Sequence, residues 1–269
     1  MALFFHDNLE FHYLDRGSGL PVVFQHGLGG NIDKIFSLLE LPSGSRLIGM
    51  DCRGHGRTNA LGPVEELRFD RFTDDLIALL NQLGVERAVI GGTSMGAGVA
   101  LNCALRYPRR VLGLVLLRPA WLDSPNEPNA RLFGTIAQLL QVHELQEAQK
   151  LFTQTALFES IAKASSDSAE SLLAFFSDPR VSETTTLLEH IPRDAPSRDR
   201  AQWRGISQPA LVLATHGDPV HPFAFAEVLA RHIPNAQFLA LTPKSVSLAR
   251  YKSDLNTAVA DFLHTQFLC

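Results

Sequence analysis

Hydrophobic positions along the 269-residue chain follow two periods, which distinguish predicted strands from predicted helices. Short apolar runs rich in β-branched residues, bounded by glycine, proline or polar residues, predict buried strands. Apolar residues every three to four positions predict helices that bury one face. The predicted strands are 11–14, 21–25, 46–50, 85–90, 111–117, 209–214 and 236–241, and the predicted helices are 69–83, 95–107, 139–152, 162–171, 223–233 and 248–267.

The order of these elements predicts the fold class. The first forty residues are expected to form strands joined by tight turns, and strands then alternate with helices, which favours an α/β fold with a mostly parallel sheet covered on both faces. Residues 121–203 show helical periods and no strand pattern. We therefore expect one domain with an insertion: residues 1–120 and 204–269 form the core, and residues 121–203 form a helical cap over the ligand-binding carboxyl edge of the sheet.

A nucleophile elbow is predicted at Gly92-Thr93-Ser94-Met95-Gly96. A strand pattern precedes this segment and a helix pattern follows it, which is the context that a Gly-x-Ser-x-Gly motif requires. The alternative is that Ser94 only caps the helix. Attack by a serine on a carbonyl carbon needs N–H donors for the developing oxyanion. The candidate donors are the backbone N–H groups of Met95 and of Leu28, which lies in a glycine-rich loop after an earlier strand.

Three segments in this order resemble the α/β-hydrolase superfamily: His26-Gly27, then residues 51–56, then the Ser94 elbow followed by a helical region. The chain is most similar to the small capped esterases, lactonases and carbon–carbon hydrolases of that superfamily. The resemblance implies the α/β-hydrolase fold and the chain order nucleophile, acid, histidine. It also implies that residues 51–56 form a structural loop beside the site, so we expect His55 to be structural.

Asp218 matches the position of the acid in this resemblance, because it follows the predicted strand 209–214 in a turn before a helix. Its expected role is to hold and polarise an imidazole. Two alternatives remain open: Asp218 could cap the helix that begins near Pro222, or Asp123, after the strand that ends near Leu117, could be the acid.

The histidine of the family pattern is missing from its expected loop. Residues 241–247 follow the last predicted strand, and Ser245 stands where the base is expected. His221, three residues after Asp218, is the first candidate to replace it. Lys244 is a second candidate, since burial can lower the pKa of a lysine enough to activate a serine. His190 in the cap, His216, and an altered histidine at position 245 are further alternatives, whereas His26 is expected to shape the oxyanion loop.

Composition excludes several other classes of function. The formal charge is −4, and no run of like charges suggests a nucleic-acid partner. Cys52, Cys103 and Cys269 are few and far apart, which predicts reduced thiols in a cytosolic protein. No zinc-ligand spacing occurs, so we expect neither a metal nor a cofactor. The sequence contains no signal-peptide pattern and no membrane-spanning run, which predicts a cytoplasmic protein without a membrane partner.

These features together predict a serine hydrolase of a small, fairly apolar ester, thioester or lactone, with an atypical or displaced base. Two alternatives remain: a ligand-binding or sensor protein that has lost turnover, and a lyase or cofactor-free oxygenase on the same fold. A small molecule is the expected partner. The oligomeric state is open, and an exposed apolar cap edge would allow a homodimer.

Overall fold

The computed structural model describes residues 2–268 and contains one eight-stranded sheet. The strand order is β1-β2-β4-β3-β5-β6-β7-β8, with β1 and β2 antiparallel to their neighbours and the other pairs parallel. The α/β-hydrolase fold class predicted above is confirmed. The strands are β1 (Ala2–His6), β2 (Leu9–Gly17), β3 (Leu20–Gln25), β4 (Ser45–Met50), β5 (Ala88–Thr93), β6 (Val111–Leu117), β7 (Ala210–Thr215) and β8 (Ala236–Leu241).

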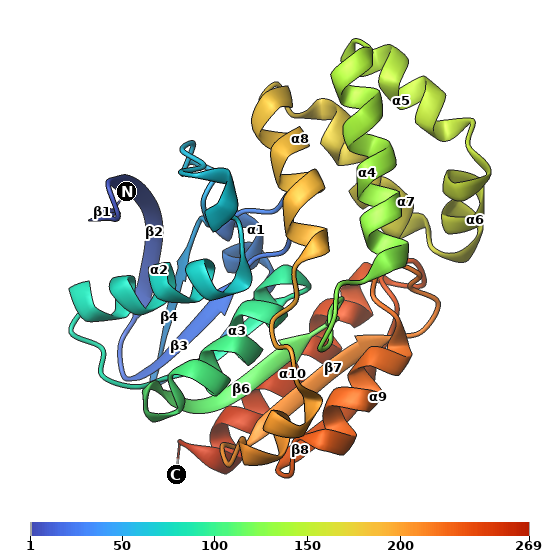
Figure 1. The fold of residues 1–269 in the computed structure, drawn as a ribbon. Helices are drawn as coiled ribbons and strands as arrows, with labels where there is room; N and C mark the ends of the chain where they lie inside the picture. The colour runs from blue at the N-terminus through green and yellow to red at the C-terminus, as the bar shows by residue number, and fades with distance from the viewer. Residues whose placement is uncertain (1, 269) are drawn as a thin grey trace.

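Helices cover both faces of the sheet, and a further group of helices lies beyond its carboxyl edge (Figure 1). The covering helices are α1 (Ile32–Leu38), α2 (Phe69–Gln82), α3 (Met95–Arg106), α9 (Phe223–His232) and α10 (Leu248–Gln266). The group beyond the edge is α4 (Glu127–Val142), α5 (Leu145–Thr153), α6 (Ala156–Ala164), α7 (Ser166–Leu173) and α8 (Val181–His190). Short 3₁₀ turns are η1 (Val64–Glu66), η2 (Pro108–Arg110), η3 (Ala174–Ser177), η4 (Ile191–Arg193) and η5 (Arg200–Gly205).

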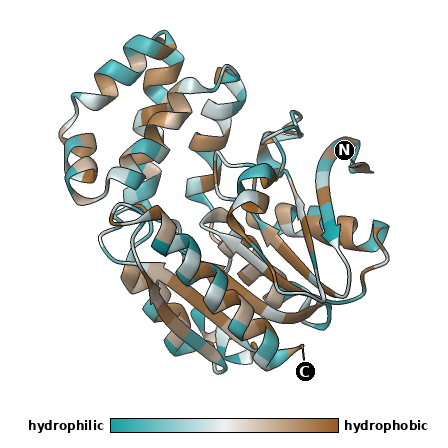
Figure 2. Ribbon diagram, turned by 180° about the vertical axis from the view of Figure 1, so that it is seen from behind, coloured by the Kyte–Doolittle hydropathy of each residue, from teal (hydrophilic) through white to brown (hydrophobic). Residues whose placement is uncertain are grey.

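Alternating side chains of the central strands build a core on each face of the sheet. Val23, Ile90 and Leu116 pack with α2, α3 and α9, while the neighbouring Val89 and Val115 pack with α1 and α10. This period of two follows from the pleat, which turns successive side chains to opposite faces. Because both faces of the central strands are buried, these strands are mostly apolar, and Figure 2 shows much of their ribbon in brown.

Local patterns located many of the elements. The strand predicted at 111–117 is confirmed at both ends, and the helix at 69–83 is confirmed to within one residue. The strand predicted at 85–90 was placed too early, because β5 runs on to Thr93, which pairs with Leu117 of β6. Helix α1 was missed in the segment expected to form strands and turns. The side chain of Asn31 begins α1 by accepting a hydrogen bond from the backbone N–H of Lys34.

Residues 121–203 form helices and no strand, as the pattern predicted, but two predicted helices were wrong. The helix at 139–152 is broken at His143 and Glu144, whose extended backbones separate α4 from α5. The helix at 162–171 is broken at Ser165, whose side chain instead caps α7 by accepting from the N–H of Ser168. Both errors arose because the apolar period continues across the break.

Cys52 and Cys103 are buried free thiols, and Cys269 lies outside the described residues. Burial raises the pKa of the Cys103 thiol to about 12, so it stays protonated at neutral pH. Among residues 2–268, no helix is both long and apolar enough to cross a bilayer.

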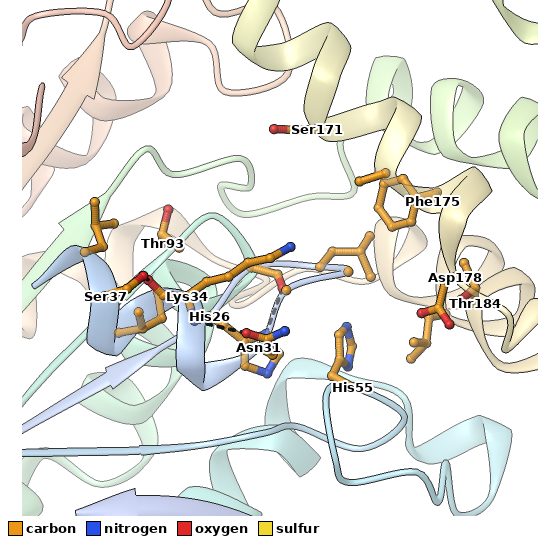
Figure 3. Close-up of a pocket in the computed structure, with 18 of the residues that line it drawn as sticks. His26, Asn31, Lys34, Ser37, His55, Thr93, Ser171, Phe175, Asp178 and Thr184 are labelled. Atoms are coloured by element: carbon orange, nitrogen blue, oxygen red, sulfur yellow. Dashed lines mark hydrogen bonds between the residues drawn. The ribbon is translucent and has the colours of Figure 1, made fainter. Parts of the chain in front are cut away.

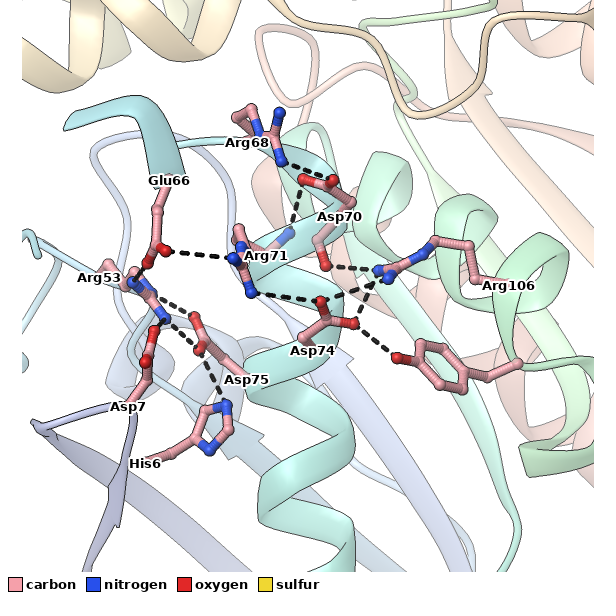
Figure 4. Close-up of polar contacts among 11 residues, drawn as sticks. His6, Asp7, Arg53, Glu66, Arg68, Asp70, Arg71, Asp74, Asp75 and Arg106 are labelled. Carbon is pink, nitrogen blue, oxygen red and sulfur yellow. Dashed lines mark hydrogen bonds and ion pairs between the residues drawn. The ribbon is translucent and has the colours of Figure 1, made fainter. Parts of the chain in front are cut away.

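The loop after β4 is held by a buried arginine. Figure 4 shows the guanidinium of Arg53 surrounded by the carboxylates of Asp7, Glu66 and Asp75. Its Nε donates to Asp75 at 2.7 Å, and its Nη2 donates to Asp7 at 2.9 Å. Both Arg53 and Asp75 are 1% exposed. This single cation therefore joins the β1–β2 turn, η1 and α2 to the loop that carries His55.

Replacing Arg53 with methionine should lower the free energy of unfolding by about 3–5 kcal/mol, because the buried carboxylate of Asp75 would lose its partner. Urea denaturation measures this change. Arg68→Met is the matched control: its pair with Asp70 is solvent-exposed and should contribute less than about 1 kcal/mol. Equal losses for the two variants would show that Arg53 does not stabilise the loop in this way.

Candidate active site

Ser94 occupies a strained turn between β5 and α3. Its φ of 55° is unusual for a residue with a side chain, and the neighbouring glycines make the turn sterically feasible. A Cβ on Gly92 would lie 2.7 Å from the Cα of Gly96, and a Cβ on Gly96 would lie 2.8 Å from the carbonyl oxygen of His26. The Ser94 hydroxyl makes no cap hydrogen bond to α3. The alternative of a serine that only caps the helix is therefore wrong.

The loop after β3 passes directly beside Ser94. A Cβ on Gly27 would lie 3.2 Å from the Cβ of Ser94, so the glycine permits this close approach. The next residue, Leu28, lines the same small cavity as Ser94. The backbone N–H groups of Leu28 and Met95 make no hydrogen bond with any residue in 2–268. Both predicted oxyanion donors thus lie next to the serine with their N–H groups unoccupied.

Asp218 is a buried carboxylate beyond the carboxyl end of β7, and both of its oxygens accept hydrogen bonds. Its Oδ2 accepts from Nδ1 of His221 at 2.9 Å and from Nε of Arg118 at 2.8 Å. Its Oδ1 accepts from the hydroxyl of Ser168 and from the backbone N–H groups of Val220 and His221, all at 3.1–3.2 Å. Burial opposes ionisation, but Arg118 and, where it is protonated, His221 outweigh this effect and hold the pKa of Asp218 far below its usual range.

Asp218 does not act as a simple helix cap. Helix α9 begins at Phe223 after Pro222, without a side-chain cap hydrogen bond. The alternative acid, Asp123, accepts from Arg200 at 2.6 Å and lines neither of the two cavities described below. Of the two carboxylates considered, Asp218 is therefore the one that contacts a histidine in the site.

The imidazole of His221 is hydrogen-bonded to the carboxylate of Asp218. An ionised carboxylate only accepts hydrogen bonds, so Nδ1 of His221 carries the proton and Nε2 remains free to accept one. The side chain is 14% exposed. Burial lowers the pKa of His221, and the charge of Asp218 partly opposes this effect. His221 is thus a largely neutral imidazole at neutral pH.

Ser94 and His221 line one small cavity. Its volume is about 130 Å³, and its walls come from the loops after β3, β5, β6 and β7 and from α4, α7 and η3. The carboxyl ends of parallel strands meet at one edge of a sheet, which brings together residues that are more than one hundred positions apart in the sequence. The apolar part of the lining is Leu28, Phe133, Leu172, Phe175 and Val220.

Arg118 is a site residue that sequence reasoning missed. It directly follows β6, has a φ of 46° and is 6% exposed. Its Nη2 lies 2.6 Å from Asp218 and 3.0 Å from Asp167 of α7. It also lines the small cavity. The sequence contained one signal for this role: an arginine directly after an apolar strand, at the edge of the sheet where ligands bind. A guanidinium buried there needs carboxylates as partners.

Lys244 and Ser245 occupy the loop from which the histidine is missing. Ser245 is exposed, whereas Lys244 is partly buried against the ring of Tyr251. The Lys244 ammonium group lies 3.6 Å from Asp167. Burial and the nearby charge of Arg118 lower the pKa of Lys244. Lys244 lines a second, larger cavity and not the small cavity around Ser94.

The remaining candidate histidines lie away from Ser94 or are already engaged. His190 is exposed at the end of α8, and His216 is exposed and stacks on Phe223. His26 donates to the carbonyl of Gly27 and accepts from the N–H of Cys52, so both ring nitrogens are occupied. Burial lowers the pKa of His55 to about 3, so it is neutral in the fold.

The larger cavity adjoins the small one and has a volume of about 380 Å³. The two cavities share Gly27, Leu28, Ser171 and Phe175. Figure 3 shows His55 on one side of this cavity, Phe175 above it and Lys34 directed across it. A volume of this size is typical of sites that bind small molecules.

A family model described as alpha/beta hydrolase fold matches residues 21–243, so the chain belongs to this family of hydrolases. The AB hydrolase superfamily protein YisY of Bacillus subtilis (strain 168) is 28% identical over 257 residues, which cover 92% of this chain and 93% of that protein. The uncharacterized hydrolase YraK of the same organism is 31% identical over 142 residues, but this match covers only 52% of this chain and 47% of YraK.

A solved structure confirms the similarity of fold. The enol-lactonase from Burkholderia xenovorans LB400 superposes with a TM-score of 0.75 at 20% identity, covering 97% of this chain and 99% of that one.

The charges around His221 predict its titration. His221 should titrate below 6.5, the ordinary value of a histidine. Arg118→Gln should raise the pKa of His221, because the lost positive charge disfavoured the imidazolium. NMR titration of the imidazole protons measures both values. Arg231→Gln, which removes an exposed charge from α9, should leave the titration unchanged. A pKa of His221 that does not move in Arg118→Gln would contradict this electrostatic account.

Proposed function

We propose that the protein hydrolyses small, fairly apolar carboxylic esters, thioesters or lactones. Ser94 is the nucleophile, His221 the general base and Asp218 the acid that orients the base. One observation carries this proposal: His221, which is hydrogen-bonded to Asp218 at 2.9 Å, lines the same small cavity as Ser94. In a serine hydrolase these groups are needed together, and none of them alone would suffice.

In the proposed reaction, Oγ of Ser94 bonds to the carbonyl carbon of the substrate while Nε2 of His221 takes the hydroxyl proton. The carbonyl electron pair moves onto oxygen, which accepts hydrogen bonds from the N–H groups of Leu28 and Met95. The carbon–oxygen or carbon–sulfur bond to the leaving group then breaks, and His221 returns the proton to that group. Water hydrolyses the acyl-Ser94 by the same route.

His221 is a better candidate for the base than Lys244. Nδ1 of His221 donates to Asp218, which leaves Nε2 as the proton acceptor, and the residue lines the Ser94 cavity. Lys244 lies against Tyr251 and Asp167, lines the other cavity, and would have to lose its proton before it could act as a base. We therefore assign the role of the expected histidine to His221, on the acid's own turn.

The walls of the cavity support the proposed substrate class. Aromatic and aliphatic side chains enclose a volume of about 130 Å³, which suits a compact apolar group beside the scissile bond. The cap supplies Phe133 and Leu172, so a polymer would have to displace it. A cytoplasmic location and a homodimer remain predictions from the sequence.

Replacing Ser94 or His221 with alanine should lower kcat for p-nitrophenyl acetate by about 10³-fold or more, since a triad fails when either group is lost. Lys244→Met should change kcat less than about tenfold, because lysine takes no part in the proposed proton transfer. His216→Ala is the matched control, because this exposed histidine lies on the same turn as His221 and outside both cavities. Steady-state kinetics on the four variants gives the comparison.

A fluorophosphonate probe tests the nucleophile separately. The expected result is a covalent label on Ser94, identified by mass spectrometry of the digested protein. Labelling without turnover of any ester would favour the binding or sensor alternative. Turnover that survives in Ser94→Ala would refute the proposed mechanism, and a loss in Lys244→Met as large as that in His221→Ala would assign the base to Lys244.

A further inference from the structure

Three lysines from separate elements line the larger cavity. Lys34 belongs to α1, Lys244 to the loop after β8, and Lys252 to α10. The whole sequence contains only five lysines, and the other two, Lys150 and Lys163, lie on α5 and α6. The chain as a whole carries a formal charge of −4. Positive side chains are therefore concentrated in this cavity, although the net charge of the protein is negative.

Neighbouring carboxylates leave this positive charge largely uncompensated. Asp178 is the acidic residue in the lining, and the guanidinium of Arg180 already holds it with Nη2 at 2.9 Å. Lys244 lies near Asp167 at 3.6 Å. Lys34 and Lys252 form no ion pair with any residue in 2–268. Figure 3 shows the side chain of Lys34 directed across the cavity. A cleft lined by charge of one sign concentrates ligands of the opposite sign.

The rest of the lining indicates what joins the anion to the reacting bond. Apolar side chains also line the larger cavity, and two of them, Leu28 and Phe175, line the cavity of Ser94 as well; the others are Ile35, Leu38 and Leu248. A hydrocarbon segment would contact these side chains, while its charged end would lie among the lysines.

The expected anion is a carboxylate and not a phosphate. Phosphate sites commonly use free backbone N–H groups at the start of a helix. The first turn of α1 borders this cavity, but the N–H of Ile32 donates to Asp51 and that of Lys34 donates to Asn31. The cavity thus offers separate ammonium groups, which suit a single carboxylate.

We infer that the larger cavity binds a carboxylate-bearing arm of the substrate. The substrate class is then a half-ester of a dicarboxylic acid, or another ester or lactone that carries a carboxylate several carbons from the scissile bond. This inference rests on the proposed function, because it takes Ser94 as the place where the bond breaks.

Two matched substrate pairs test the inference on the unmodified protein, with turnover followed by pH-stat. Monomethyl adipate against methyl hexanoate places the carboxylate on the acyl side, and 6-acetoxyhexanoate against hexyl acetate places it on the alcohol side. In one of the two pairs, kcat/KM for the anionic ester should be about five- to tenfold higher than for its neutral partner, because each exposed charge pair strengthens binding by about two- to fivefold. The difference should lie mainly in KM. About 0.5 M NaCl should remove most of this preference by screening.

Lysine variants test whether the preference for the anionic ester arises in the larger cavity. The Lys34→Gln/Lys252→Gln double variant should lose it, whereas Lys150→Gln/Lys163→Gln, which removes the same charge from the cap, should keep it. Equal or faster turnover of the neutral substrate in both pairs would overturn the inference, and so would a full preference in the Lys34/Lys252 variant.

A binding measurement separates this inference from the proposed hydrolysis. Hexanoate and 1-hexanol can be titrated calorimetrically into the protein without any turnover. Tighter binding of hexanoate that depends on Lys34 and Lys252 would support the anion site even if no ester is cleaved. Binding of 1-hexanol as tight as that of hexanoate would refute it.

Discussion

A carboxylate can stay ionised inside a protein only when opposite charge and hydrogen-bond donors surround it, and Asp218 satisfies this requirement from three parts of the chain. Arg118 reaches it from the end of β6, Ser168 from α7 of the cap, and His221 from the turn before α9. Because these donors converge on one group, the sheet edge, the cap and the turn are fixed relative to one another beside Ser94. The proposed catalytic geometry depends on this convergence.

The proposed base lies on the acid's own turn, so the loop after β8 would not have to supply a histidine. That loop carries Lys244 and Ser245 in place of a histidine. Ser245 is exposed, but Lys244 turns back toward Asp167 and forms part of the wall of the larger cavity.

The sequence predicts best what depends on short segments. The strand at 111–117 and the elbow at Ser94 follow from local apolar runs and from glycine spacing, and the structure has both. The single helix predicted at 139–152 was wrong, because the spacing of apolar residues does not reveal where the backbone changes direction. The errors on Arg118 and His221 have a different reason: Arg118 was missed, and His221 was only one of several candidates for the base. Contacts made across the sheet edge determine where these side chains point, and no local pattern encodes such contacts.

The central claim is that the imidazole of His221 accepts the proton of the Ser94 hydroxyl. A crystal structure of the protein inactivated by a fluorophosphonate tests it most directly, since the tetrahedral phosphorus mimics the reacting carbon. The account predicts a phosphorus bonded to Oγ of Ser94, with Nε2 of His221 at about 2.6–3.2 Å from that oxygen or from the ester oxygen of the phosphonate. Finding the ammonium group of Lys244 at that position, or no side-chain nitrogen within that distance, would contradict the account.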